Sequence, residues 1–150
     1  MRKSLTAASL IVAVLALSAC EKPAPSVTVF SGAQSVHTEA ACWAADCATL
    51  PEGLQLQTLA VTPGGVFGIS VDSEIAEAGW QPAILVDGQW QALEKRTIHK
   101  RYWRMTFPEG TRGAFPANGY ALQIVSAPTA DGVRGAWLFS LVDAETVDNA

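Results

Sequence analysis

The chain is poor in charged residues. Only 16% of its 150 residues are charged, and its formal net charge is −4. A nucleic-acid-binding domain normally presents a basic face, so this composition argues against a nucleic-acid partner. Intrinsic disorder requires low hydrophobicity and high net charge, whereas 49% of these residues are hydrophobic. We therefore expect a folded chain, and its length suits a single domain.

Residues that usually carry catalysis or bind metals are also scarce. The chain has three cysteines and two histidines, His37 and His99, so we expect no metal site and no cofactor. The Gly-x-Ser-x-Gly motif of hydrolases and a glycine-rich phosphate loop are both missing. No Asp or Glu stands out as an acid for glycosidase chemistry. We do not expect an enzyme, and we expect both histidines to lie on strand surfaces.

Only one hydrophobic run is long, and it lies at the amino terminus. Residues 1–19 begin with Met1-Arg2-Lys3, continue through an apolar core and end in small residues, which is the layout of a secretory signal peptide. The apolar core is too short for a comfortable membrane span. No later segment approaches that length, so we expect no transmembrane helix after cleavage.

Leu17-Ser18-Ala19-Cys20 resembles the lipobox of bacterial lipoproteins. This resemblance implies cleavage before Cys20, attachment of a diacylglycerol to its sulfur and acylation, for example by palmitate, of the new amino terminus. Two or more lipid chains anchor a protein stably, at about 0.8 kcal/mol per buried CH₂. We therefore expect an exported chain that is anchored to the outer face of the cytoplasmic membrane, with residues 20–26 as an extended tether. The alternative is an ordinary signal peptide followed by a chance cysteine.

The two remaining cysteines, Cys42 and Cys47, are separated by four residues. Export permits a disulfide between them. The pair lacks the Cys-x-x-Cys spacing of redox-active thiols, so we expect a structural bridge and not a redox site.

Beyond the tether the sequence has no sustained helical periodicity. Short β-prone segments alternate with Gly, Pro, Asp and Ser, which is typical of a sandwich or a barrel. About eight strands are predicted: 27–31, 35–39, 54–61, 66–71, a hairpin over 80–93, 102–107, 120–126 and 135–142. We predict an all-β fold, an immunoglobulin-like antiparallel β-sandwich over residues 27–142, with a small β-barrel as the alternative.

Several local features refine this prediction. Asp87-Gly88 should form a type I′ turn that places Leu85 opposite Trp90 on an apolar face of the hairpin. Pro82 cannot donate a hydrogen bond, which predicts a strand edge or a bulge. Residues 72–78 suit one helical turn capped by Asp72 or Ser73. Residues 143–150 form an acidic tail that we expect to fray.

The five tryptophans divide into two groups. Trp80, Trp103 and Trp137 have apolar neighbours at alternate positions, so we expect them in the core and not on a carbohydrate-binding platform. Trp43 and Trp90 are less constrained, and Trp43 could be exposed inside the disulfide loop.

Basic residues are distributed unevenly. After loss of residues 1–19 the chain would hold 8 basic and 14 acidic residues, and five of the basic ones lie within ten positions. With one histidine, the cluster comprises Lys95, Arg96, His99, Lys100, Arg101 and Arg104. A solvated loop and strand edge explains it, since lysines discourage edge pairing. The alternative is a patch that binds anionic lipid headgroups or an acidic wall polymer.

Five short motifs follow one another over about 117 residues. They are Val27-Thr28-Val29-Phe30, the Cys42/Cys47 pair, Gly79-Trp80-Gln81, Tyr102 to Phe107 closed by Pro108, and Ala136-Trp137-Leu138. In these features the chain resembles an actinobacterial family of short lipoproteins known as domain of unknown function 2771. The resemblance implies a location in the cell envelope and supplies no catalytic residues. Gln81-Pro82 departs from the unbroken strand that the family pattern implies, which questions the pairing of that strand.

These features together favour a binding or interaction module at the cell envelope, with an envelope polymer or protein as partner. The alternatives are an accessory subunit of an envelope complex and an uncharacterised envelope enzyme. An exposed aromatic and basic groove would favour the module, a flat apolar patch the accessory subunit, and a pocket with a perturbed carboxylate or histidine the enzyme.

Overall fold

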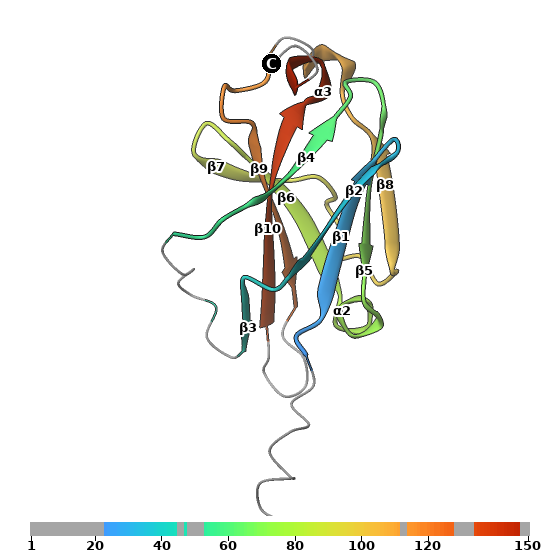
Figure 1. Ribbon diagram of the computed structural model, residues 1–150. Coiled ribbons are helices and arrows are strands. Elements are labelled where there is room, and N and C mark those ends of the chain that lie inside the picture. Colours follow the sequence, from blue (N-terminus) through green and yellow to red (C-terminus); the bar gives the residue numbers. More distant parts are fainter. Residues whose placement is uncertain (1–22, 45–46, 48–52, 112–113, 128–133, 148–150) are drawn as a thin grey trace, which may run out of the picture.

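The computed structural model describes residues 23–44, 47, 53–111, 114–127 and 134–147. Within these ranges two β-sheets pack face to face as a sandwich (Figure 1). Neither sheet closes on itself in the described part of the chain, which confirms the predicted sandwich and makes the barrel alternative wrong.

The first sheet has four antiparallel strands in the order β2-β1-β5-β8. Its strands are β1 (Ser26–Ser31), β2 (Gln34–Glu39), β5 (Val66–Val71) and β8 (Tyr102–Thr106). Alternate residues point into the core because successive side chains of a strand project to opposite faces. Phe67, Ile69 and Val71 are accordingly buried, as their spacing predicts.

The second sheet is built around its carboxyl-terminal strand, β10 (Arg134–Asp143), and has the path β3-β10-β9-β6-β7. The other strands are β3 (Cys42–Ala44), β4 (Gln57–Val61), β6 (Trp80–Val86), β7 (Gln89–Ala92) and β9 (Tyr120–Ser126). One edge of β10 pairs with β9, while the other pairs first with β3 and then, in parallel, with β4. The strand predicted over 54–61 begins only at Gln57, which is where pairing with β10 begins. The described ranges hold ten strands: the eight predicted segments, one of which is the two-stranded hairpin, and β3, which was not foreseen.

Short helices complete the fold. The predicted turn is α2 (Ser73–Ala78), and Asp72 is its N-cap residue without a capping side-chain hydrogen bond. The acidic tail was expected to fray from Asp143, but β10 includes this residue, and α3 (Ala144–Val147) follows it. A 3₁₀ turn, η2, spans Glu109–Thr111. In the part of the chain that the structure describes, no helix is long and apolar enough to cross a membrane.

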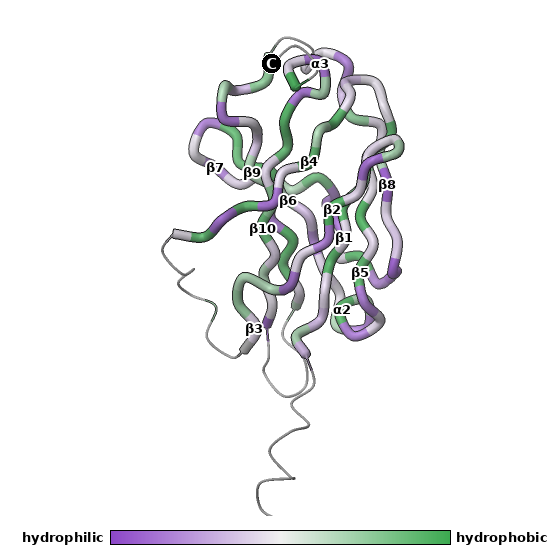
Figure 2. Tube along the Cα trace, in the orientation of Figure 1, coloured by the Kyte–Doolittle hydropathy of each residue, from purple (hydrophilic) through white to green (hydrophobic). Residues whose placement is uncertain are grey.

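The largest side chains in the core between the sheets are aromatic. The largest fully buried side chains include Trp80, Trp137, Phe67 and Phe139. Figure 2 colours the chain by hydropathy, with hydrophobic stretches in the central strands and hydrophilic residues at the start of β8. The core positions of Trp80 and Trp137 are therefore confirmed.

Trp43 is half-buried and packs against the core, which corrects the expectation that it could be exposed. Its ring lies 6.0 Å from that of Trp137. Both rings pack at Gly135, where a Cβ atom would overlap Trp137 and lie 2.7 Å from Trp43. The missing side chain of Gly135 therefore gives Trp43 its place against the core.

Strand β6 is not interrupted at Pro82, contrary to the doubt raised by its sequence. Pro82 pairs with Ile124 of β9, and its carbonyl accepts a hydrogen bond from Leu93 N–H at 2.9 Å on the opposite side. The N–H and C=O of one strand residue point to the same side. The N–H that Pro82 lacks would therefore point away from β9, at a position beyond the last pair of the β6–β7 ladder, Ala83 with Ala92. The ladder with β9 therefore stays intact.

The β6–β7 hairpin has the predicted turn and register. Asp87 and Gly88 have φ angles of 50° and 76°, and Leu85 faces Trp90. Its apolar face is not buried, however, and Trp90 is 44% exposed. The inward positions of β6 are Trp80, Pro82 and Ile84, so Leu85 and Trp90 face away from the core.

Candidate functional site

The basic segment between β7 and β8, residues 94–101, is held firmly against the start of β6. Backbone hydrogen bonds of 2.9 and 3.0 Å join Ile98 and Trp80 in both directions. The Trp80 indole N–H donates to the carbonyl of Lys100 at 2.9 Å, and the Gln81 amide donates to that of Glu94 at 2.8 Å. Ile98 is only 8% exposed. The core thus fixes the backbone of this segment while its charged side chains point to solvent.

Three basic side chains surround one hollow, which we call the basic hollow. It has a volume of about 530 Å³ and is lined mainly by Arg96, His99, Lys100 and Trp103, with Glu94 at the same site. Trp103 is half-buried, so it both packs against the core, as expected, and lines the hollow. Exposed cations beside an indole suit a ligand that has an anionic group and a flat or apolar part.

No carboxylate within the described ranges forms an ion pair with Arg96 or Lys100. Among the described residues, the carboxylate of Glu94 accepts a hydrogen bond from the backbone N–H of Arg96 at 3.4 Å, and not from its guanidinium. Both cationic groups are therefore available to an external anion.

The structure divides part of the predicted cluster between different surfaces, although Arg101 and His99 together line a smaller hollow of about 310 Å³. Arg101 lies at the end of the molecule where the tether enters, in a hollow of about 380 Å³ that Pro23 and Pro25 also line. Its Nε donates to the carbonyl of Val71 at 3.5 Å. Arg104 projects from β8 on the outer face of the first sheet. Lys95 is exposed and does not line the basic hollow.

The two histidines lie apart. His37 is exposed on β2, as predicted, with Nδ1 at 3.0 Å from Thr28 Oγ1. His99 is exposed in the segment that precedes β8 and not on a strand, because the ladder with β5 starts only at Tyr102.

The tether end is pinned by two side chains, Asp72 between β5 and α2 and Trp137 on β10. The carboxylate of Asp72 accepts hydrogen bonds from Ser26 N–H at 2.8 Å and from its hydroxyl at 3.0 Å. The indole N–H of Trp137 donates to the carbonyl of Pro25 at 3.0 Å. Asp72 therefore holds the start of β1 where the sequence had suggested a helix cap.

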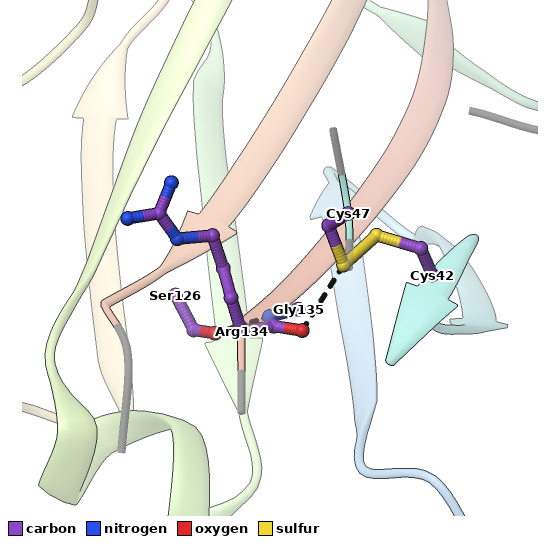
Figure 3. Close-up of a disulfide and its surroundings, with 5 residues drawn as sticks. All are labelled: Cys42, Cys47, Ser126, Arg134 and Gly135. Carbon is purple, nitrogen blue, oxygen red and sulfur yellow. Dashed lines mark hydrogen bonds between the residues drawn. A yellow bond between two sulfur atoms is a disulfide. The ribbon is translucent and has the colours of Figure 1, made fainter. Parts of the chain in front are cut away.

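The predicted disulfide forms between Cys42 and Cys47, whose Cα atoms are 5.7 Å apart (Figure 3). Cys47 Sγ lies 3.1 Å from the carbonyl oxygen of Arg134. This is a close contact and not a true hydrogen bond, because a disulfide sulfur has no proton to donate. On the other side of β10, the hydroxyl of Ser126 accepts from Gly135 N–H at 2.8 Å. The disulfide thus holds β3 against the start of β10, which fits a structural role.

Cys20 lies outside the described residues. The residues that are described include no group of three or more His, Cys, Asp or Glu side chains that could hold a metal ion. No protein-family model, curated protein or solved structure matches the chain.

Proposed function

We propose that this protein is a lipid-anchored binding module that holds an anionic component of the cell envelope in the basic hollow. The anchor is Cys20, at the position that the lipobox resemblance implies. The hollow belongs to the folded domain, which the tether joins to the membrane.

The basic hollow carries this proposal. It combines Arg96, Lys100 and the half-buried indole of Trp103 on a backbone that is fixed to Trp80. A preorganised site loses little conformational freedom on binding, which favours affinity. Each Lys or Arg near a charged surface contributes about 1 kcal/mol, so two of them together change affinity about thirtyfold.

The test compares two double variants of equal charge change. The chain with Cys20→Ser cannot take up the lipid, so binding reports the folded domain alone. We expect R96Q/K100Q to bind soluble polyphosphate or phosphatidylglycerol vesicles at least tenfold more weakly, because both cations are lost from the hollow. K95Q/R134Q is the matched control, since both residues are exposed and neither lines the hollow.

Isothermal titration with polyphosphate and vesicle co-sedimentation measure the two sources of anion separately. Polyphosphate binding alone identifies a polymer ligand, and vesicle binding alone identifies headgroups. Equal losses in the two double variants, or binding to neither probe, would overturn the proposal. Neutral phosphatidylcholine vesicles control for nonspecific adsorption.

An accessory role in an envelope complex has one specific observation in its favour. Leu85 and Trp90 face away from the core on the hairpin, and Trp90 is 44% exposed. Crosslinking in intact cells from this face, followed by identification of the captured partner, tests that role. Capture of only lipid or polymer would contradict it.

A further inference from the structure

Two aromatic side chains lie together on the outer face of the first sheet. The rings of Phe30 and Tyr102 have centroids 5.5 Å apart and planes that differ by 13°. They come from β1 and β8, which are separated by β5. Phe30 reaches across Gly68, where even a Cβ atom would overlap its ring. The bare backbone of Gly68 is therefore what allows the two rings to meet.

The need to cover Gly68 accounts for the position of the Phe30 ring, but it does not account for the exposed ring of Tyr102. Phe30 is half-buried, whereas Tyr102 is 49% exposed. Val66, on the same outward-facing set of β5 positions as Gly68, is also 49% exposed. The outer face of the sheet therefore carries an apolar strip of Phe30, Tyr102 and Val66 that is partly exposed to solvent. The two aromatic rings give it a large rigid surface.

The side chain of Arg104 is placed beside this strip. Arg104 pairs in register with Gly68, so it is placed opposite the slot that Phe30 fills. It is exposed, and among the described residues it has no ion-pair partner. Glu39 lies at the tether end of the same face, opposite Ser26 and away from the register position of Arg104. The middle of the face therefore favours an anionic ligand.

We propose that this face binds a carboxylated polysaccharide. The apolar C–H face of a pyranose ring packs on the Phe30–Tyr102 pair, and its carboxylate pairs with the guanidinium of Arg104. Arg suits this role because its planar fork matches the two oxygens of a carboxylate. The strands hold all three side chains on one rigid sheet. This site is distinct from the basic hollow and does not depend on it.

The experiment uses the purified full chain in a polyoxyethylene detergent, which carries no sugar that would compete. The probes are polygalacturonate, alginate and hyaluronate, with dextran as the neutral control, and affinity is measured by isothermal titration calorimetry. We expect Tyr102→Ala and Arg104→Gln each to weaken binding of at least one carboxylated probe by fivefold or more. Phe30→Leu should weaken it similarly, but it also removes the distal ring atoms that cover Gly68, so the exposed Tyr102 and Arg104 variants carry the test.

Two matched variants serve as controls. Trp90→Ala removes an aromatic residue of similar exposure from the other sheet, and Arg134→Gln removes an exposed arginine there. Both should leave affinity unchanged. Polyphosphate binding should be insensitive to Tyr102→Ala, which separates this face from the basic hollow. Failure of all three probes to bind, equal binding of dextran, or full affinity in Tyr102→Ala would overturn the inference.

Discussion

At Gly119 the backbone leaves no room for a side chain. Its φ angle is +73°, and an added Cβ atom would overlap the carbonyl oxygen of Leu141 on β10. Gly32 has a similar φ angle of +58°, but no atom lies within 4 Å of its Cβ position. The two glycines therefore separate the cost of a left-handed backbone from the cost of a close approach.

We expect Gly32→Ala to lower the free energy of unfolding by about 1 kcal/mol, the strain of an L-residue in the left-handed region. Gly119→Ala should lower it by about 3 kcal/mol, because the backbone of β10 must also shift. Urea unfolding followed by tryptophan fluorescence measures both. Equal losses would show that the approach to Leu141 contributes nothing.

Tryptophan burial shows how far single residues could be assigned from sequence. Alternation along strands correctly placed Trp80 and Trp137 in the core. Trp43 lies on the three-residue strand β3, which is too short to display a period. Its packing depends on the space at Gly135, which is distant in sequence.

Among the elements, β3 depends most clearly on a covalent link. The Cys42–Cys47 disulfide closes a short loop next to the ladder between β3 and β10. Chain entropy predicts that such a loop stabilises the folded state by about 2 kcal/mol. We expect C42A/C47A, or reduction of the native chain, to lower the free energy of unfolding by this amount.

Urea unfolding with and without dithiothreitol measures the effect. The double variant is the control for the reagent, since it has no bridge left to reduce and should be insensitive to it. A native chain whose stability does not change on reduction would contradict the prediction. Two titratable thiols in the unfolded, unreduced chain would show that no bridge forms.

Elements with strong local signals were predicted well. The hairpin was predicted from Asp87-Gly88 and its flanking strands, and its register is confirmed. The start of β4 at Gln57 and the parallel pairing with β10 were not foreseen. Nor was α3, where the Asp143 side chain accepts a hydrogen bond from Glu145 N–H at 3.0 Å. The start and pairing of β4 depend on β10, a partner distant in sequence, whereas the Asp143 contact at α3 is a local signal that the expectation of a frayed tail overlooked.

At the scale of the whole molecule, the proposed lipid anchor on Cys20 would connect the folded domain to the membrane. We expect the mature chain to begin at Cys20 and to carry a diacylglyceryl group and an amide-linked acyl chain. Mass spectrometry of the amino-terminal peptide measures this directly. Cys20→Ser should move the protein out of the membrane fraction, because the acyl chains supply the binding energy.

Cys42→Ser is the matched control, since it removes a cysteine without touching the anchor. An unmodified Cys20 at the mature amino terminus would contradict the anchor. So would a Cys20→Ser chain that stays in the membrane fraction after washing at high salt, which screens electrostatic attachment to headgroups.

Local sequence patterns were enough to predict most of the strands, the alternation of their apolar residues and the pairing of Cys42 with Cys47, but not β3 or the start of β4 at Gln57. These properties are local: period-two alternation and turn chemistry act over a few residues. Tertiary structure decided that Arg96 and Lys100 share a hollow with Trp103, and that Arg101 lies at the tether end. It also brought Phe30 and Tyr102 together across β5. Which strands become neighbours is set by long-range packing of the two sheets, and that information is not contained in any short segment.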